Sequence, residues 1–242
     1  LETSDSPGEV ENGYGLQLPQ FLGSYMFQVQ DRVGKRQPAL FRRKGYAQEW
    51  KLLIDPDKIE RGSALDWHYP SPDGRYVAFG LSKGGDEQSV LYLVETESGK
   101  LLPELILYTS FCRLAWLPDS SGFYHSAGLA NDFVNAKKYL FFHRLGCQFS
   151  EQEAIDFNDI YISPVLSEEG RYLVVNVNWE MPKASWYKDR YGDNVWKPFL
   201  NDLDGESFGE FYKDRYLVLT TDNAPRGRVV SVPIENASDR GS

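Results

Sequence analysis

A segment that recurs about every 48 residues is the feature that most constrains how this chain can fold. Each copy has an apolar approach, an acidic turn that closes on glycine, and a strand-like run led by an aromatic residue. The turn glycines are Gly74, Gly122 and Gly170, so both spacings are 48 residues. Weaker copies occur around Gly23 and Arg215. A period of this length predicts a repeat architecture, in which one supersecondary unit is used several times.

Turn chemistry and residue patterning predict that each repeat is a small antiparallel sheet. Asp-Gly and Ser-Gly pairs reverse the chain tightly because glycine tolerates positive φ. After the first of these turns, residues 76–81 carry apolar side chains on both faces, which predicts a strand buried on both sides. Further strands are expected at residues 51–54, 89–95, 138–144, 153–155 and 228–232. Each repeat then holds about four strands, the content of a propeller blade.

We therefore predict an all-β fold, a β-propeller of about five four-stranded blades. A single blade cannot bury both of its faces, and stacking blades against one another buries them. A polar leader without periodicity is expected at residues 1–19 and the propeller domain at residues 20–242. The expected blades cover approximately residues 20–62, 63–107, 108–157, 158–204 and 205–242. Trp67 and Trp116 are expected to pack between blades.

Charge and cysteine content restrict the partners and the compartment that we expect. The formal net charge is −9, which repels nucleic acid unless a local basic patch exists. The best candidates, Lys35-Arg36 and Arg42-Arg43-Lys44, are interpreted as the solvent face of a strand pair, so no nucleic-acid partner is expected. Two cysteines, Cys112 and Cys147, do not make a disulfide scaffold, so a reduced, cytoplasmic protein is expected. No apolar run is long enough to cross a bilayer, so no membrane partner is expected.

One sequence motif is similar to the nucleophile motif of serine hydrolases. Gly80-Leu81-Ser82-Lys83-Gly84 matches the nucleophile-elbow pattern G-x-S-x-G. The elbow requires a strand, a sharp turn and then a helix, whereas the residues after Gly85 lead into a β-rich run. We interpret the segment as a glycine-rich loop between blade strands, and we expect no catalytic residue here.

The three histidines, His68, His125 and His143, each fall in an expected strand or strand edge, with no catalytic motif around them. They are interpreted as structural. No pair of His or Cys residues has the short spacing of a metal site, so neither a metal nor another cofactor is expected.

An ordered set of short segments resembles the propeller of the prolyl oligopeptidase family. No segment is specific alone, but their order along the chain is. The set comprises Asp55-Pro56, Ala64-Leu65-Asp66, Ser71-Pro72-Asp73-Gly74-Arg75-Tyr76, Gly80-Leu81-Ser82-Lys83-Gly84-Gly85-Asp86-Glu87, Glu97-Ser98-Gly99-Lys100-Leu101-Leu102-Pro103, Ala115-Trp116-Leu117-Pro118-Asp119, Ser121-Gly122-Phe123-Tyr124, His143-Arg144-Leu145-Gly146 and Glu169-Gly170-Arg171-Tyr172-Leu173.

This resemblance implies a seven-bladed propeller over the mouth of an α/β-hydrolase domain, where it admits short peptides to a buried Ser-Asp-His site. The present sequence departs from that pattern, because it shows about five blades and no hydrolase domain. By their positions relative to the blade motifs, Phe111, Tyr161 and Met181 resemble residues that line the outer substrate pocket of the family. The alternative is that they are ordinary loop or core residues.

Three functions stay open at this point. The favoured one is a non-catalytic gating or substrate-filter propeller, inactive as a peptidase alone, whose partners are peptides or a hydrolase catalytic domain. The second is a free-standing binding scaffold for a protein or peptide. A sugar-active propeller is a weaker third, because it needs carboxylates that converge at the central channel. An incomplete ring also exposes blade faces and strand edges, which predicts either closure with fewer blades or self-association through the open edges.

Overall fold

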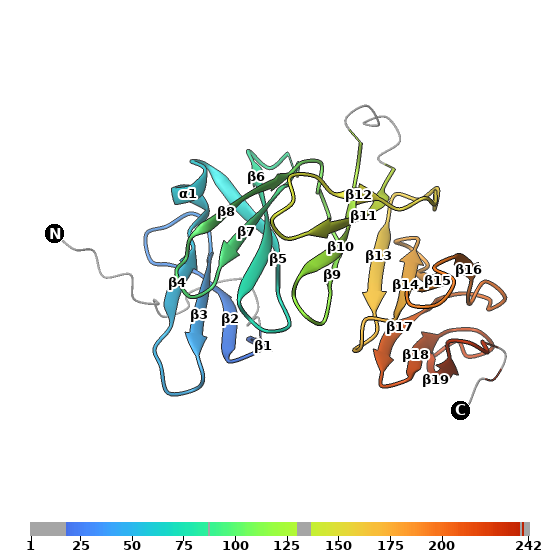
Figure 1. Cartoon of the computed structure of the whole chain (residues 1–242). Helices are drawn as coiled ribbons and strands as arrows, with labels where there is room; N and C mark the ends of the chain where they lie inside the picture. The colour runs from blue at the N-terminus through green and yellow to red at the C-terminus, as the bar shows by residue number, and fades with distance from the viewer. Residues whose placement is uncertain (1–17, 87, 130–136, 238, 240–242) are drawn as a thin grey trace. The chain divides into compact units, whose positions relative to one another are not determined.

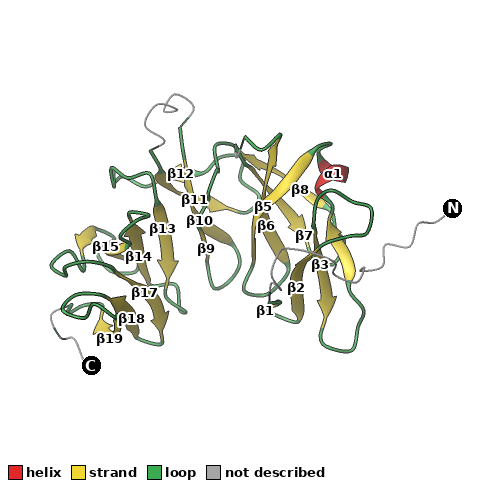
Figure 2. Cartoon of the chain, turned by 180° about the vertical axis from the view of Figure 1, so that it is seen from behind, coloured by secondary structure: helices red, strands yellow, loops and turns green. Residues whose placement is uncertain are grey.

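The computed structural model describes residues 18–86, 88–129, 137–237 and 239 (Figure 1). The expected leader at residues 1–19 therefore lies almost wholly outside the described residues. Within the described part the fold is nearly all β, with one short helix, α1 (Pro56–Ile59), which stands out in Figure 2. The chain divides into two compact units, residues 1–111 and residues 112–242.

The first unit consists of two four-stranded antiparallel sheets whose strands follow the order of the sequence. The first sheet contains β1 (Gln20–Leu22), β2 (Tyr25–Gln30), β3 (Ala39–Lys44) and β4 (Lys51–Ile54). The second contains β5 (Ser63–Pro70), β6 (Tyr76–Lys83), β7 (Val90–Glu95) and β8 (Leu101–Ile106). Phe27 and Leu40 of the first sheet share one buried cluster with Val77 and Phe79 of the second. Each sheet therefore shields a face of the other from water.

The second unit repeats this plan. Its first sheet contains β9 (Leu114–Trp116), β10 (Gly122–Ala127), β11 (Tyr139–Arg144) and β12 (Glu151–Gln152). Its next sheet contains β13 (Ile162–Leu166), β14 (Tyr172–Val177), β15 (Lys183–Asp189) and β16 (Trp196–Pro198), and the last contains β17 (Ser207–Tyr212), β18 (Arg215–Thr220) and β19 (Arg228–Pro233). The last two sheets join through one parallel pair, Lys183 with Ser207.

Buried apolar side chains connect the neighbouring sheets of the second unit. Tyr124 and Leu140 pack with Leu173 and Val175 of the next sheet. The opposite face of that sheet supplies Val174 and Ala184 to a cluster with the last sheet, to which Tyr216, Val218, Val230 and Val232 belong. β14 is therefore buried on both faces, as expected for a strand of apolar residues in a stacked blade. The all-β fold of about five blade-like sheets is confirmed.

Most of the strands expected from the sequence are present. Residues 51–54 form β4, and those expected at 89–95, 138–144 and 228–232 correspond to β7, β11 and β19 within a residue at each end. The prediction of a strand at residues 153–155 is wrong, because the short edge strand β12 lies at Glu151–Gln152. A two-residue edge strand carries too little pattern for its position to be read from the sequence.

The register of the repeat also differs from the expectation. The backbone N–H of Gly74 bonds to the carbonyl of Ser71, and that of Gly170 bonds to Ser167, but the equivalent donor in the third blade is Ser120, which bonds to Leu117. Ser120 has φ of 59°, like Gly74 at 72° and Gly170 at 74°. Gly122 instead opens β10, where a Cβ would lie 2.5 Å from the carbonyl oxygen of His143. The repeat is therefore irregular, and glycine marks a close approach rather than a turn in the third blade.

The two tryptophans expected between blades, Trp67 and Trp116, each contact a neighbouring strand of their own sheet. The indole of Trp67 lies over Gly80, where a Cβ would be only 2.3 Å from its ring, and Nε1 donates to the carbonyl of Thr109. The ring of Trp116 packs edge-on against Phe123 of the neighbouring strand, at 4.8 Å between centroids. Each ring thus covers an adjacent strand, and in the case of Trp67 the missing Cβ of Gly80 provides the space.

Candidate functional site

Two of the three expected pocket residues lie at the same edge of one blade. Tyr161 immediately precedes β13, and Met181 lies in the connection from β14 to β15. Asp159 Oδ1 accepts the backbone N–H of Tyr161 at 2.8 Å, which fixes the approach to β13. Asn178, with φ of 70°, reverses the chain after β14, and its Oδ1 accepts the N–H groups of Glu180 and Met181. Asparagine suits this position because its side chain stabilises the turn locally.

Sequence reasoning missed two residues that belong to the same edge. The ring of Trp179 meets that of Tyr161 edge-on, at 5.3 Å between centroids. The Arg113 guanidinium lies 5.5 Å from the Tyr161 ring centroid and 6.0 Å from that of Trp179. Trp179 is 62% exposed and Met181 46% exposed. We call Arg113, Tyr161, Trp179 and Met181 the aromatic edge, which exposes apolar surface while the Arg113 cation lies beside the two rings.

The third expected residue, Phe111, ends the first unit. It is 64% exposed and has φ of 50°, and Tyr108 in the same loop has φ of 61°. Bulky residues rarely adopt the left-handed region, because the Cβ crowds the backbone there. Such strain in an exposed aromatic loop is typical of a residue kept for a function other than stability.

The thiol of Cys112, the residue before Arg113, is not an activated nucleophile. Cys112 is buried, and burial raises the pKa of its thiol to about 12. A thiol that holds its proton at neutral pH is a poor nucleophile. Cys112 and Cys147 are both free thiols, and a cytoplasmic location stays a prediction.

Ser82 has the environment of a structural serine. It lies in β6, is 5% exposed, and donates to Asp66 Oδ1 at 2.8 Å, while Ser89 donates to the other oxygen of Asp66. The G-x-S-x-G segment spans the end of β6 and the turn toward β7, so it is partly strand and not wholly a loop. No helix follows it, and the strand–turn–helix geometry of a nucleophile elbow is absent from this described segment.

The histidines lie in strands, as expected. The hydroxyl of Ser150 lies 3.0 Å from His125 Nε2 and 3.1 Å from His143 Nδ1, and both histidines are fully buried. Burial, reinforced by His143, lowers the pKa of His125 to about 3. Burial likewise lowers the pKa of His68 to about 4. Imidazoles this weakly basic do not act as general bases at neutral pH. In the described ranges, no group of three His, Cys, Asp or Glu side chains has a metal-binding arrangement.

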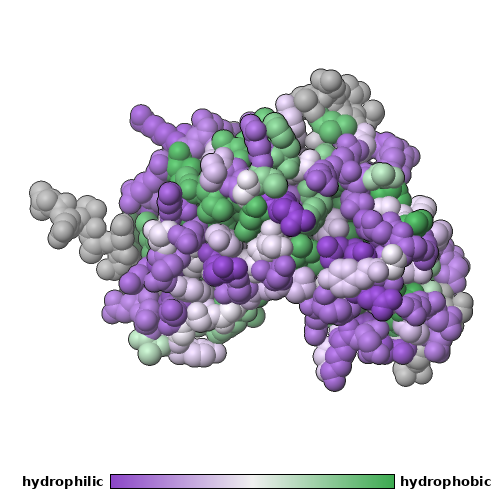
Figure 3. Space-filling model, in the orientation of Figure 1, coloured by the Kyte–Doolittle hydropathy of each residue, from purple (hydrophilic) through white to green (hydrophobic). Residues whose placement is uncertain are grey.

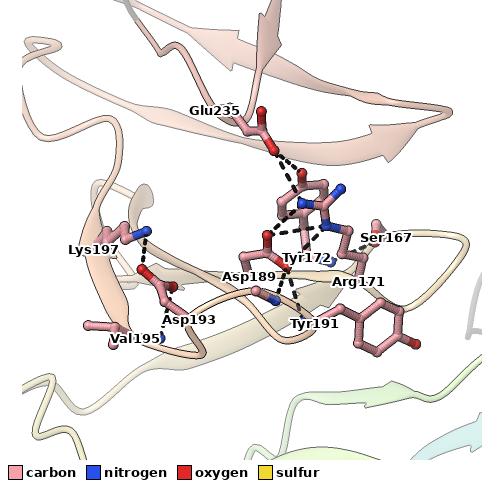
Figure 4. Close-up of polar contacts among 10 residues, drawn as sticks. Ser167, Arg171, Tyr172, Asp189, Tyr191, Asp193, Val195, Lys197 and Glu235 are labelled. Carbon is pink, nitrogen blue, oxygen red and sulfur yellow. Dashed lines mark hydrogen bonds and ion pairs between the residues drawn. The ribbon is translucent and has the colours of Figure 1, made fainter.

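A polar network connects the fourth blade to the segment after β19 (Figure 4). The Arg171 guanidinium donates to Asp189 at 2.7 Å and to Glu235 at 3.3 Å, and the Tyr172 hydroxyl donates to Glu235 at 2.6 Å. The hydrogen bond from Arg171 lowers the pKa of Asp189, whereas burial and the Glu235 carboxylate raise that of Tyr172 to about 12. Every carboxylate of this network already has a donor, so we interpret it as structural.

The stacked antiparallel sheets of the described residues define a β-propeller domain. Residues 12–241 match the sequence profile of the prolyl oligopeptidase N-terminal β-propeller domain, and the chain belongs to that family. Prolyl endopeptidase of Elizabethkingia meningoseptica is 26% identical over 241 residues, which cover 94% of this chain and 34% of that protein. Prolyl oligopeptidase A of Galerina marginata is 24% identical over 78% of this chain and 30% of its own length.

Solved structures share the fold. A prolyl endopeptidase superposes with a TM-score of 0.84 and 23% identity, over 93% of this chain and 35% of its own. Prolyl oligopeptidase B of Galerina marginata superposes with a TM-score of 0.77 and 18% identity, over 93% and 36%. The chain thus spans about a third of the length of its relatives, and these 242 residues contain propeller sequence without an α/β-hydrolase domain.

Proposed function

We propose that this propeller is the substrate filter of a prolyl oligopeptidase-type peptidase and contacts peptides on their way to a hydrolase domain. The single observation that carries the proposal is the aromatic edge on a domain of this family. A Galerina marginata relative has been solved with a 35-residue hydrolysis and macrocyclization substrate, so a protein of this family accepts peptides. A partly exposed tryptophan and methionine suit peptide side chains, because both offer apolar area and methionine adapts its shape.

The aromatic edge and Phe111 supply the contacts in this proposal. Tyr161, Trp179 and Met181 form the contact surface of the second unit, and Phe111 provides a separate contact from the first unit. Arg113 positions the rings of Tyr161 and Trp179, because its guanidinium lies beside both of them. A ring fixed by a cation loses less conformational freedom on binding than a free one, which favours peptide affinity.

The test measures peptide selectivity in the presence of a hydrolase domain. The isolated hydrolase domain of the Elizabethkingia relative is assayed with a short proline-containing peptide and with a long unfolded protein, with and without this chain. The proposal predicts that adding the chain suppresses cleavage of the long substrate more than that of the short one. Binding of peptides without any effect on the hydrolase would instead support the binding-scaffold alternative.

We also propose that the chain self-associates through an open blade edge. Among the described strands, β8 pairs with β7 alone; Leu105 of β8 is 56% exposed, and Leu107, just after β8, is 52% exposed. Apolar residues appear at the surface over this region in Figure 3. An exposed apolar edge strand is a template for pairing with another chain. Light scattering at about 0.1 mM, above the concentration at which weak interfaces populate, is expected to show dimers that Leu105→Lys dissociates. A strictly monomeric wild-type particle would exclude this mode.

A further inference from the structure

The first blade contains an arginine that lies beside aromatic rings and has no carboxylate partner within the part of the chain that the structure describes. The Arg43 guanidinium carbon lies 4.7 Å from the ring centroid of Trp50 and 5.8 Å from that of Tyr46. Its Nε donates to Met26 Sδ at 3.2 Å. Among the described residues, no ion pair or further side-chain hydrogen bond involves Arg43. The terminal nitrogens of the guanidinium are therefore available to a ligand, in an orientation that three side chains fix.

Aromatic rings lie beside this guanidinium and extend along the same face of the sheet. Phe21 of β1 is opposite Met26 in the register, and Met26 is opposite Arg43, so the three side chains form a row across one face of the sheet. The rings of Phe21 and Tyr46 lie 5.8 Å apart and are 55% and 76% exposed. Large exposed rings next to an oriented guanidinium are typical of a recognition surface, because aromatic residues and arginine dominate binding energies there.

The positive charge of Arg43 favours an anionic partner. Arg42 and Lys44 point to the opposite face of the sheet, where both lie over the ring of Tyr25. Arg43 therefore supplies the positive charge of its own face, next to the exposed rings. The chain as a whole has a net charge of −9. The net charge disfavours an extended polyanion such as nucleic acid, so a short anion with an apolar neighbour fits best.

We propose that Phe21, Arg43, Tyr46 and Trp50 bind a peptide carboxylate next to an apolar residue. The carboxylate accepts two hydrogen bonds from the terminal nitrogens of Arg43, the strong bidentate geometry of arginine. The neighbouring side chain of the peptide covers the rings of Phe21 and Tyr46. An acidic side chain and a C-terminal carboxylate provide the same chemistry. This site lies in the first blade and does not depend on the proposed filter function or on a hydrolase domain.

Calorimetry with two pairs of blocked peptides tests the proposal at about 0.15 M salt, where exposed charges more than a Debye length apart are screened. The first pair is acetyl-Gly-Phe-Glu-Gly-amide and its Gln twin. The second is acetyl-Gly-Gly-Phe with a free and with an amidated C-terminus. A carboxylate form is expected to bind at least tenfold more tightly than its neutral twin, and the pair with the larger ratio identifies the source of the carboxylate.

Variants separate this site from general electrostatic attraction. Arg43→Ala is expected to weaken binding of the carboxylate peptide at least tenfold, and Arg43→Lys to weaken it also, because lysine keeps the charge but loses the fork geometry. Arg36→Ala removes a basic residue from the same blade and is expected to leave binding unchanged. The thermal unfolding midpoint of each variant shows that it is folded. Equal binding of the paired peptides, or equal losses in Arg36→Ala and Arg43→Ala, would overturn the proposal.

Discussion

The ammonium group of Lys188 donates to both carboxylate oxygens of Glu153, each at 2.7 Å, and so ties β15 of the fourth blade to the residue that follows β12 of the third. Both side chains are largely buried, at 4% and 16% exposed, and the indole of Trp196 donates to the same carboxylate. The rings of Tyr124 and Trp196 also lie within 6 Å of the ammonium. The two blades are thus joined by a satisfied ionic contact as well as by apolar packing.

Removing one partner of this contact is expected to cost more than removing both. Glu153→Gln leaves a buried ammonium without its counter-ion, and we expect a loss of about 3 kcal/mol in the free energy of unfolding. The double variant Glu153→Leu/Lys188→Met removes both charges and is expected to recover most of that loss. Urea denaturation of the three proteins measures this. Asp193→Asn, which breaks the exposed pair with Lys197, serves as the control and should leave the midpoint unchanged.

We expect Phe111 to lower the folding stability of the chain and to contribute to peptide binding. Its φ of 50° favours glycine, so Phe111→Gly should be more stable than Phe111→Ala by about 1 kcal/mol, although both remove the same ring. Both variants are expected to bind a proline-containing peptide more weakly than the wild type. Equal stability of the two variants would show that the loop is not strained at this residue.

The buried His125 makes the stability of the second unit depend on pH. Its pKa of about 3 lies below the ordinary value of 6.5, so the unfolded state binds the proton more readily. The stabilisation is complete above pH 6.5 and is lost as the pH falls toward 3. Between pH 7 and pH 4 we expect protonation of His125 to lower the free energy of unfolding by about 3 kcal/mol. The neighbours of His125 are His143, Ser150 and the rings of Phe123 and Phe141. His125→Gln should show a shallower pH slope, measured by urea unfolding; an unchanged slope contradicts the assignment.

The corrected register of the repeat can be tested at its turns. Gly74→Ala places a Cβ 2.5 Å from the carbonyl oxygen of Leu22 at a positive φ, and we expect a loss of about 2 kcal/mol. Ser120 occupies the same turn position with φ of 59°, so Ser120→Gly should be more stable than Ser120→Ala by about 1 kcal/mol. If alanine and glycine were equally stable at position 120, the two turns would not be equivalent.

The sequence predicted the fold because the blade signal is local. Turn residues and alternating apolar side chains lie within a few positions of each other, so β6, β7 and β11 were found nearly in place. The glycine spacing misled at one blade because Gly122 and Gly74 are glycines for different physical reasons. Both glycines would place a Cβ 2.5 Å from a backbone carbonyl oxygen, but only Gly74 also has a positive φ at the turn. Only tertiary contacts distinguish these two needs.

The site was predictable only in part. Tyr161 and Met181 could be named from their positions relative to the blade motifs. Trp179 and Arg113 could not, because the ring and cation meet only when the approach to β9, the approach to β13 and the end of β14 come together. The turn at Asn178 was the one local signal, since asparagine after a strand often reverses the chain and aims the next side chains outward. The cation in the first blade, Arg43, was visible in the sequence only as part of a basic run.

Incubating the purified chain with a chromogenic proline-containing peptide, while following binding and turnover together, tests the central claim most directly. The account predicts saturable binding that Trp179→Ala weakens at least fivefold, with no release of chromophore. Turnover that Ser82→Ala abolishes would contradict it, because a serine that donates to Asp66 inside a strand would then be a working nucleophile.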